Sequence, residues 1–492
     1  MSTTCMFITH NGHAFPLADC PVLPIESFRQ AVVDAVAAGG RLSALFAYPA
    51  GLGQLRLLAA IARTEQGDIA VLTANLGEQY LAITPDCPQA HLYEREIFEQ
   101  WNVLPLGHPW LKPVRFPKPE TCGRPDFFSM TGEEVHEVAV GPVHAGIIEP
   151  GHFRFQCHGE TVYHLEISLG YQHRGIERAM VGGPTPRTIH YAETIAGDST
   201  AAHAAAYCRA VEALGQARVP ARAQALRGVT LELERVANHI GDLGALAGDV
   251  GFLPTMSYCG GIRGDVLNMT ALLCGNRFGR GMVRPGGVAF DVDARIVEQL
   301  QQWLDSTKRD ARSAIELLWN TPSVMARFDG VGIVPADQCE QLGLVGVAAR
   351  ACGVARDVRE NFPYAIYRFA HIPVSTWHSG DVFARAYVRW LEVRRSLAFI
   401  AEQLDALPEG CTTESVSEIA ANHAVVTLIE GWRGEICHVA ITGDGGRFAA
   451  YKVVDPSFHN WFGLAMALRS QQVSDFPLCN KSFNLSYCGH DL

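Results

Sequence analysis

Charged residues are scarce in this sequence, at 18% of 492 residues, where about 25% is usual. Acidic residues outnumber basic ones by 51 to 40, which gives a net charge of −11 and argues against a nucleic-acid binder. No apolar run approaches the roughly 18 residues that indicate a membrane-spanning helix. The opening MSTTCMFITHNGHAF lacks the pattern of a secretory signal. So little charge is typical of a subunit that is covered by partners.

Several chemical motifs are also missing. None of the fourteen cysteines forms a C-x-x-C pair, so we expect most of them to be unconnected, reduced structural thiols. The sequence contains no phosphate-binding loop of the Walker or G-x-G-x-x-G type. It also contains no G-x-S-x-G or H-E-x-x-H motif. The motifs alone therefore indicate no nucleotide site, nucleophile or zinc site.

Residues 1 to 112 are predicted to form a compact α+β unit. Helical spacing followed by two glycines predicts a helix over 27–40. Apolar or alternating runs predict strands over 41–50 and 67–77. The charged, aromatic segment 91–101 is predicted to be a second helix.

A proline-rich polar stretch follows this unit. It contains Pro113, Pro117, Pro119 and Pro125. Proline continues neither a helix nor a central strand, so an extended linker is expected here. We divide the chain into a domain over 1–116, a linker over 117–134 and a second domain over 135–492.

The second domain is predicted to be α+β, with a central bundle of long helices and small flanking sheets. Short strands and turns are expected over 135–177. Long helices are expected over four segments, namely 189–217, 226–250, 294–320 and 383–407. Strands return near the end, where GDGG (443–446) is predicted to be a hairpin turn.

The segment 141–155 places polar groups on an otherwise apolar, glycine- and proline-rich stretch. His144 and Glu149 lie there with His152 and Arg154. A carboxyl group in apolar surroundings has a raised pKa and can carry protons near neutral pH. The alternative is that Glu149 pairs with an arginine and only fixes a loop.

Two further clusters contain potential site residues. His173, Arg174 and Glu177 lie close together, as in a solvated charged turn. In ETIAGDSTAAH (193–203), a continuous helix would put Ala196, Ser199 and His203 on one face. Asp198 and Ser199 would cap a helix that was broken there, and His203 by itself would be a core residue.

The tail DFPLCNKSFNLSYCGHDL (475–492) holds two cysteines in a C-x8-C spacing. That spacing is not a usual one for metal ligands. We expect instead that the tail docks through apolar side chains, namely Phe483, Leu485 and Tyr487.

Segments 141–155 and 159–177 resemble the N-terminal region of group 4 NiFe-hydrogenase large subunits and of the 49 kDa-type, quinone-site subunit of complex I. The likeness continues through LELERVANHIGDLGALAGDVGF, GRGMVRPGGV, HSGDVFARAYVRWLEVRRSL and EGWRGE. Residues 93–116 are similar to the smaller, thirty-kilodalton-type subunit of complex I. In hydrogenases of the formate hydrogenlyase and hydrogenase-4 type these two parts are fused. The resemblance thus implies a thirty-kilodalton-like domain followed by a large-subunit fold.

The chain departs from the hydrogenase pattern at the metal ligands. Group 4 hydrogenases hold nickel and iron with two C-x-x-C pairs. At the first pair this sequence has Ala196 and Ser199. At the second, aligned from Asp475, it has Ser486 and Gly489. These residues offer none of the soft thiolates that the metals require, so we expect no metal in this chain.

The chain also departs from the complex I pattern at the quinone. His144 matches the first histidine of the family's quinone loop, but Ile148 stands where the second histidine binds the headgroup. Gly197 replaces the quinone-binding tyrosine. Arg174 is retained, and Glu149 matches a glutamate linked to proton movement in group 4 hydrogenases. We therefore expect a degenerate pocket. It is lined by Ser199, Asp198, Ser486 and His203, together with His144, Glu149 and Arg174.

The resemblance implies a subunit of a membrane-associated, complex I-related oxidoreductase without a NiFe centre, in which electron transfer is coupled to ion or proton translocation. A non-catalytic scaffold and a functional NiFe hydrogenase are the alternatives, so whether this chain is itself catalytic stays open. NAD and quinone are ligands of the family.

The implied partners are a small subunit of the twenty-kilodalton type, which carries a 4Fe-4S cluster, and antiporter-like membrane subunits. This chain itself is expected to bind no cofactor, although a quinone-like acceptor could enter the pocket. The expected location is peripheral, on the cytoplasmic face of the inner membrane.

Overall fold

The computed structural model describes residues 6–51, 53–116, 126–144 and 148–492. Its first sheet has the order β1-β6-β5-β4, and β3 pairs with β6. The bounds are β1 Phe7–Thr9, β3 Val22–Leu23, β4 Arg41–Pro49, β5 Leu55–Arg63 and β6 Asp68–Leu76. Helices α1 (Ile25–Ala37) and α2 (His91–Trp101) pack against it. The predicted helices and strands of this unit are confirmed, and β5 is a strand that the sequence analysis did not identify.

A second sheet lies beside the first and joins the two ends of the chain. Its order is β16-β15-β14-β2, all antiparallel. The bounds are β2 Ala14–Pro16, β14 His423–Glu430, β15 Glu435–Thr442 and β16 Phe448–Val454. β15 and β16 also pack on β4, which explains why the central strands of both sheets are buried, continuous apolar runs. The predicted turn at 443–446 is confirmed, since Gly446 N donates to Gly443 O at 3.0 Å.

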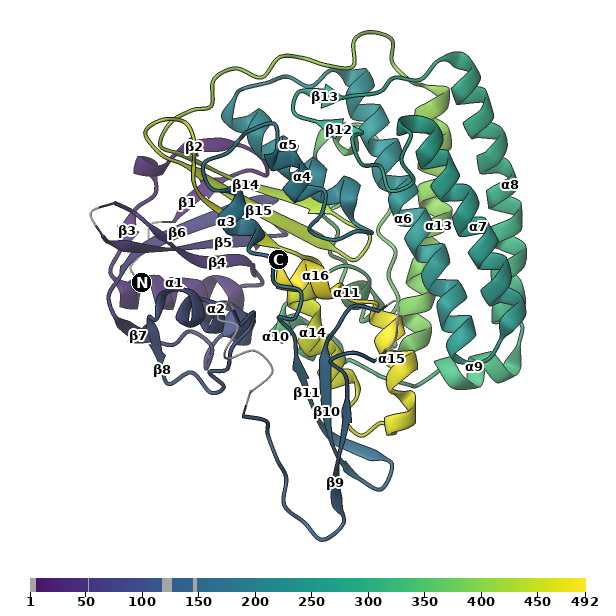
Figure 1. The fold of residues 1–492 in the computed structure, drawn as a ribbon, viewed down its shortest axis with the longest axis horizontal. Coiled ribbons are helices and arrows are strands. Elements are labelled where there is room, and N and C mark those ends of the chain that lie inside the picture. The colour runs from purple at the N-terminus through teal and green to yellow at the C-terminus, as the bar shows by residue number, and fades with distance from the viewer. Residues whose placement is uncertain (1–5, 52, 117–125, 145–147) are drawn as a thin grey trace.

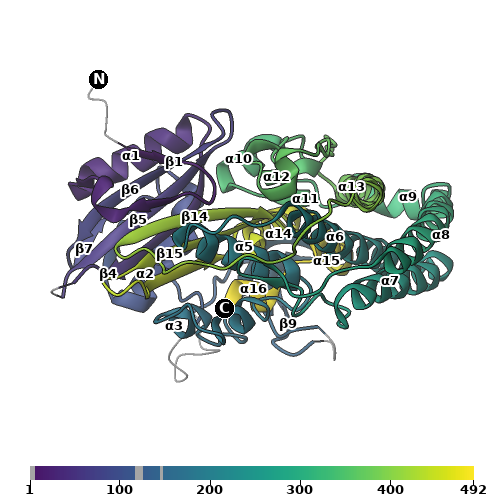
Figure 2. The same cartoon turned by 90° about the horizontal axis from the view of Figure 1, so that it is seen from above.

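A bundle of long helices forms the other side of the molecule (Figures 1 and 2). It consists of α6 Ala221–Asp249, α7 Leu253–Cys274, α8 Ala294–Trp319 and α13 Val382–Asp405. α6 packs against both α7 and α13. The bundle is confirmed, but one of its expected helices is wrong. Segment 189–217 is not one long helix, because it forms α4 (Thr188–Ala192) and α5 (Thr200–Leu214) with a non-helical break between them.

The remaining elements connect the sheets to the bundle. A three-stranded sheet, β9 Val135–Val140, β10 His152–His158 and β11 Thr161–Ser168, projects from the molecule (Figure 1). Two short pairs are β7 Gln79–Leu81 with β8 Leu104–Leu106, and β12 Val283–Arg284 with β13 Gly287–Val288. The short helices are α3 Ile176–Met180, α9 Pro322–Phe328, α10 Ala336–Leu342, α11 Gly346–Ala351, α12 Val358–Asn361, α14 Pro456–Ala467, α15 Phe476–Phe483 and α16 Tyr487–Asp491.

Single 3-10 turns complete the chain at η1 Leu17–Asp19, η2 Pro88–Ala90, η4 Ala365–Arg368 and η5 Val473–Asp475. No helix in the described ranges has both the length and the apolar character needed to cross a bilayer. Part of the predicted linker, residues 117–125, lies outside the described residues. The division into domains therefore stays a prediction.

A buried cluster of charges joins the bundle to the second sheet. Its members are Glu232 and Arg235 on α6, Glu392 on α13, Glu430 on β14, Arg350 on α11, and Asp357 and Arg359 at the start of α12. Each of these side chains is paired with at least one opposite charge. Buried charges are tolerated only when they are paired in this way, so the cluster fixes how α6, α13 and β14 sit against each other.

Candidate functional site

Four segments that are far apart in the sequence converge near the centre of the molecule. They are the break at 193–199, the turn at 431–434 between β14 and β15, the start of α14, and the tail around α16. The yellow α14 and α16 lie side by side between the second sheet and the bundle in Figure 1. Three of the side chains that the sequence analysis proposed, Asp198, Ser199 and Ser486, lie on these segments.

Asp198 forms a two-point ion pair with Arg433. The two carboxylate oxygens accept from Nη1 at 2.6 Å and from Nη2 at 2.7 Å. Trp432 lies under the guanidinium, 3.9 Å away, and donates Nε1 to Asp198 O at 2.8 Å. The expected side-chain cap is wrong, because Ser199 is the N-cap residue of α5 but its hydroxyl makes no capping bond. Asp198 is drawn out of the cap by the stronger charged partner.

His203 belongs to a series of four buried, hydrogen-bonded side chains, Asp455, His203, His438 and Tyr451. Its Nε2 lies 3.0 Å from Asp455 Oδ2, and its Nδ1 lies 3.1 Å from Nε2 of His438. His438 Nδ1 in turn lies 2.9 Å from the hydroxyl of Tyr451. His203 is therefore a core residue, as its surroundings predicted, but it is a core residue with a polar partner on each side.

The pKa shifts of Asp455 and His438 favour one arrangement of protons among these four side chains. Burial would raise the pKa of Asp455, but the hydrogen bond from His203, with the cation of Arg433 nearby, holds that pKa below its usual value. Burial holds the pKa of His438 well below its usual value. In the resulting arrangement Tyr451 donates to a neutral His438, His438 donates to His203, and His203 donates to the Asp455 carboxylate.

The positions aligned with the metal ligands are occupied by residues that bond to their own neighbours. Ser486 Oγ accepts from Gly489 N at 2.9 Å and caps α16. A Cβ atom on Gly489 would lie 2.6 Å from the carboxyl carbon of Asp455. Ala196 is fully buried and presents only a methyl group. These side chains do not fit a nickel–iron centre, whose metals need thiolates.

Cys488 is the remaining sulfur at this place. Its thiol lies 3.4 Å from Ser486 Oγ, and burial together with the nearby charge of Glu149 raises its pKa to about 12. It is therefore a protonated thiol and a poor metal ligand. Among the described residues, no group of three or more His, Cys, Asp or Glu side chains could hold a metal ion.

Glu149 lies at the edge of the same place and holds the tail. Its Oε2 accepts from the backbone N–H of Tyr487 at 3.2 Å and of Cys488 at 3.3 Å. It forms no ion pair with an arginine within the described ranges, so the arginine alternative is not the one observed. His144 packs beside Phe153 and Tyr487, and burial lowers its pKa. Residues 145–147 of this loop lie outside the described residues.

Arg174 ties the tail to the break before α5. Its Nη2 donates to Ile195 O at 2.9 Å and to Cys488 O at 3.1 Å. His173 Nδ1 lies 2.8 Å from Asp491 O, and Glu177 pairs with Lys452 at 3.0 Å. The cluster of His173, Arg174 and Glu177 is therefore not simply a solvated turn, because each of these side chains bonds to the tail or to β16. The tail is docked by buried Phe483, Leu485 and Tyr487, as expected.

These contacts fill much of the place where a degenerate pocket was expected. The backbone N–H of Ser486 is also satisfied, since it donates to Ser457 Oγ at 2.8 Å. The loop that would close the expected pocket includes undescribed residues, so the pocket stays a prediction. Among the described residues, no direct hydrogen bond joins two of the side chains assigned to it; they bond instead to neighbours such as Arg433, Asp455 and Gly489.

Next to Asp198, a small cavity contains a carboxyl group that the sequence analysis missed. Glu234 accepts from Ala201 N at 2.7 Å and from Ala202 N at 3.3 Å. Burial, and the charge of Asp198, raise the pKa of Glu234 to about 8. The cavity measures about 10 Å³, room for about one water, and Asn238 and Arg277 also line it.

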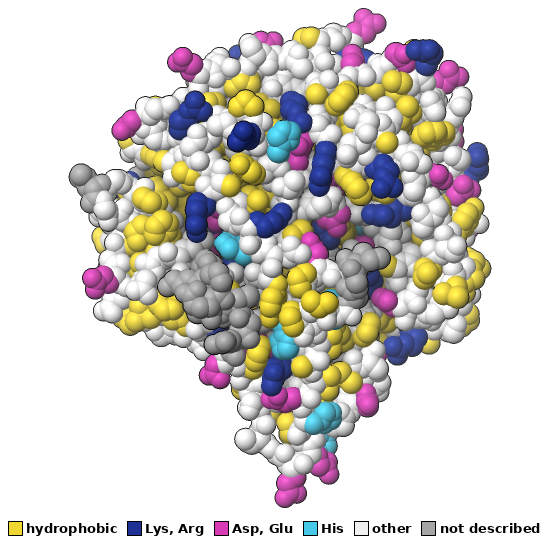
Figure 3. Space-filling model, viewed as in Figure 1, with side chains coloured by type: hydrophobic (Ala, Val, Ile, Leu, Met, Phe, Trp, Pro, Cys, Tyr) yellow, Lys and Arg dark blue, Asp and Glu magenta, His cyan; other side chains and the backbone are white. Residues whose placement is uncertain are grey.

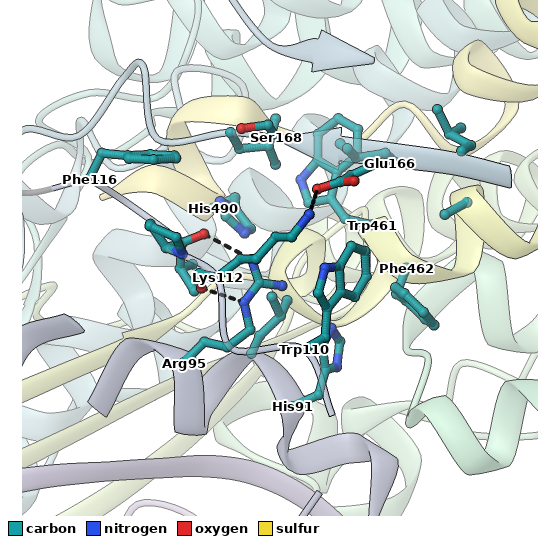
Figure 4. Close-up of a pocket in the computed structure, with 17 residues that line it drawn as sticks. His91, Arg95, Trp110, Lys112, Phe116, Glu166, Ser168, Trp461, Phe462 and His490 are labelled. Atoms are coloured by element: carbon teal, nitrogen blue, oxygen red, sulfur yellow. Dashed lines mark hydrogen bonds and ion pairs between the residues drawn. The ribbon is translucent and has the colours of Figure 1, made fainter. Parts of the chain in front are cut away.

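A second cavity, of about 50 Å³, lies between α2, β11, α14 and α16 (Figure 4). Its cations are already satisfied, since Arg95 donates to the carbonyls of Lys112 and Pro113 at 2.7 and 2.8 Å. Lys112 Nζ is 2.7 Å from Glu166 and lies over the ring of Trp110. We therefore interpret it as part of the packing between the first sheet and the tail.

Arg433, Asp455, His438 and Tyr451 were not singled out from the sequence. For two of them a signal was available. Asp455 precedes Pro456 and Ser457, which is an N-cap followed by proline at the first helical position. Arg433 stands in a tight turn between Gly431 and Gly434. His438 and Tyr451 face each other only because β15 and β16 pair, and no local pattern reveals that.

The surface around the site is unlike the molecule as a whole. Figure 3 shows Lys and Arg side chains gathered over the part of this face where Figure 1 places α3, α4 and the upper bundle. Exposed arginines of these segments are Arg174, Arg178, Arg187, Arg277 and Arg280. A local basic area on a chain of net charge −11 is a feature of the tertiary structure.

The comparisons with known proteins agree with this architecture. Residues 249–491 match the family described as the respiratory-chain NADH dehydrogenase 49 Kd subunit. The chain is 32% identical to the carbon monoxide-induced hydrogenase of Rhodospirillum rubrum over 351 residues, which are 71% of this chain and 97% of that protein. It is 28% identical to formate hydrogenlyase subunit 5 of Escherichia coli K12, over 83% of this chain and 76% of the relative. It is 30% identical to NADH-quinone oxidoreductase subunit 4 of Thermus thermophilus, over 70% of this chain and 90% of the relative.

These matches define the class of protein first: a subunit of the oxidoreductases related to complex I and to hydrogenase-4-type hydrogenases. The chain belongs, within that class, to the family that the 49 Kd subunit of respiratory-chain NADH dehydrogenase shares with these hydrogenase subunits. The mixed helix and strand fold and the long-helix bundle predicted from the sequence are confirmed.

Proposed function

We propose that this chain is the large subunit of a membrane-associated, complex I-related oxidoreductase and takes part in electron transfer coupled to ion or proton translocation, without a NiFe centre. The observation that carries the proposal is at the former ligand positions. Ser486 caps a helix there, and Gly489 is packed against Asp455. The family supports the electron-transfer complex, and these contacts argue against the metal.

We extend the proposal to the rest of the assembly. Residues 1–116 would be a thirty-kilodalton-like domain, which their own five-stranded sheet supports. A small subunit of the twenty-kilodalton type would supply the 4Fe-4S cluster, and antiporter-like membrane subunits would anchor the complex. The chain would then lie peripherally on the cytoplasmic face of the membrane, and a quinone-like compound would be the acceptor.

In such a subunit, the hydrogen-bonded side chains from Asp455 to Tyr451 would move a proton. Asp455, His203, His438 and Tyr451 share three hydrogen bonds. Tyr451 would pass its hydroxyl proton to His438, His438 would pass one to His203, and His203 would pass one to Asp455. Tyr451 would regain a proton from outside the chain, so that one proton is taken up, Asp455 becomes protonated and all three hydrogen bonds reverse direction. Neutral imidazoles suit such a relay because each has one donor and one acceptor nitrogen.

The proposal is tested on the complex purified from native membranes. We expect an iron–sulfur subunit to copurify and elemental analysis to find no stoichiometric nickel. Nickel at one atom per chain would contradict the proposal and favour a true hydrogenase. Recovery of this chain alone, without partners, would also contradict it.

Two substitutions distinguish a catalytic subunit from a scaffold. We expect Glu149→Gln and His203→Gln each to lower the rate of coupled ion transport at least tenfold. This is a conservative figure, because a positioned proton-transfer group contributes about a hundredfold or more to a rate. His371→Gln is the matched control, since His371 is exposed and pairs with the exposed Glu360. Unchanged transport in both site variants would favour the scaffold.

A further inference from the structure

A cavity of about 310 Å³ lies apart from the predicted site residues. This volume is within the range of small-molecule sites. Four segments meet around it: the loop before β2, the end of α5 with its connection to α6, the start of α6, and the turn η4. None of the residues assigned to the oxidoreductase site lines it.

Three arginines give this cavity a surplus of positive charge. Arg209 donates Nη2 to Asn11 O at 2.7 Å, but its buried Nε has no partner. Arg218 and Arg368 are exposed, and no ion pair or hydrogen bond of either guanidinium occurs within the described ranges. Arg227 and Glu212 also line the cavity, but their charges cancel, because Arg227 Nη2 lies 2.5 Å from Glu212 Oε1. Three cations at one cavity, two of them unpaired in the described part of the chain, create a positive local potential that attracts an anion.

The rest of the lining is apolar and partly aromatic. Ile366, Phe369, Leu231 and Ile429 contribute to it, and Tyr364 lies 5.6 Å below the Arg209 guanidinium. Phe369 is 83% exposed, which is unusual for so large an apolar side chain. Its ring is therefore available to stack against a planar ligand at the rim.

We propose that this cavity binds a small organic anion with a planar ring, of the class of the mononucleotides. The phosphate group would bond to Arg209, Arg218 and Arg368, and the ring would lie against Phe369 and Ile366. Arginine suits this role because its fork of N–H groups matches the geometry of a phosphate. A motif search does not detect such a site, since the arginines come from separate segments instead of a glycine-rich loop. The proposal does not depend on the proposed function.

The test is isothermal titration calorimetry on the purified full-length chain. The probes are AMP, adenosine and inorganic phosphate. We expect AMP to bind with a dissociation constant below about 1 mM, and each of the other two to bind at least tenfold more weakly. Charged hydrogen bonds of this kind are worth roughly tenfold or more in affinity each. Equal binding of adenosine, or no binding of AMP at concentrations up to tenfold above this limit, would overturn the proposal.

Variants locate the binding. Arg218→Ala and Arg368→Ala should each weaken AMP binding by about tenfold. Phe369→Ala should weaken binding of AMP while leaving that of phosphate unchanged. The control is Arg309→Ala, an exposed arginine on α8, which should change nothing. If AMP binds the three cavity variants as it binds the unmodified chain, the cavity is not the site. Circular dichroism establishes that each variant is folded.

Discussion

At the residue scale, the site is a set of side chains that hold one another in place. Asp198 is fixed by Arg433 and Trp432, and Asp455 is fixed by His203 and by the N–H of Ser457 at 2.8 Å. Because the acceptors are already satisfied inside the protein, a ligand here must either replace these contacts or lie beside them. This distinguishes the site from an open metal pocket.

Gly489 provides a direct test of how tightly this place is packed. Gly489→Ala adds a Cβ atom 2.6 Å from the Asp455 carboxyl carbon, so we expect the free energy of unfolding to fall by about 1 to 3 kcal/mol. Chemical denaturation measures this. Gly445→Ala is the matched control, since no atom lies within 4 Å of its added Cβ. Equal stability of the two variants would show that Asp455 moves freely.

Glu234 predicts a dependence of stability on pH. Its pKa is about 8 in the folded chain and about 4.3 when unfolded, so between these values only the unfolded state loses the proton. Stability contributed by the protonated carboxyl is therefore complete below about pH 4 and is lost as the pH rises towards 8.

We expect Glu234→Gln to remove this loss. The variant should become more stable relative to the unmodified chain as the pH rises from 5 to 8, in urea denaturation at a series of pH values. Glu298→Gln, at an exposed position on α8, should show no such trend. A parallel pH dependence of Glu234→Gln and the unmodified chain would mean that Glu234 is ionised in the folded state.

At the scale of elements, two differences from the expected helices have a common cause. The segment 189–217 is alanine-rich and was predicted to be one helix. Arg433 and Trp432 nevertheless bond to Asp198 and hold residues 193–199 out of the helix. Helix α7 was not predicted at all, because Gly260, Gly261 and Gly264 lower its helical propensity. α6 and α8 supply the packing that stabilises it. In both cases tertiary contacts outweigh the local preference.

The buried charge cluster is the element-scale feature with the largest expected energetic effect. Arg359 pairs with Glu232 on α6 and with Asp357 at the start of α12. Arg359→Met would remove a cation from both buried carboxylates, and we expect the free energy of unfolding to fall by about 3 to 5 kcal/mol. Urea denaturation measures it. Arg312→Met, at an exposed pair on α8, should leave the midpoint unchanged; an equal loss in both variants would contradict the role given to burial.

At the scale of the whole molecule, the ends of the sequence are built into one core. β2 near the start pairs with β14 near the end, and the first sheet packs against the second. Asn11 strengthens this link, since its side chain bonds to Leu428 N and O at 2.8 and 2.9 Å and to Phe362 O at 2.9 Å. The first segment of the chain therefore contributes to the stability of the second sheet.

Substitution of Asn11 measures that contribution. Asn11→Ala leaves buried backbone groups of Leu428 and Phe362 without partners, and we expect a loss of about 2 to 3 kcal/mol in the free energy of unfolding. Thermal and urea unfolding test it. Asn268→Ala, on the exposed side of α7, is the control, and a loss no larger than in this control would show that the two ends are joined only loosely.

Local pattern in the sequence was enough to predict the elements with strong periodicity or clear turns. α1, α2, α6, α8, α13 and the hairpin of β15 and β16 follow from residue spacing and from glycine. The absence of C-x-x-C pairs could also be established from the sequence, because it depends only on which residues stand at the metal-ligand positions. Candidate residues such as Glu149, Arg174 and His203 could be proposed from their motifs.

Only the tertiary structure decided how these residues act together. Asp455, His438 and Arg433 reach His203 and Asp198 across more than 230 residues of sequence, and the arginines of the large cavity come from separate segments. Hydrogen bonds and charges act through space over a few ångströms. The folding of the chain therefore determines which donors and acceptors meet, and the spacing of residues along the sequence does not.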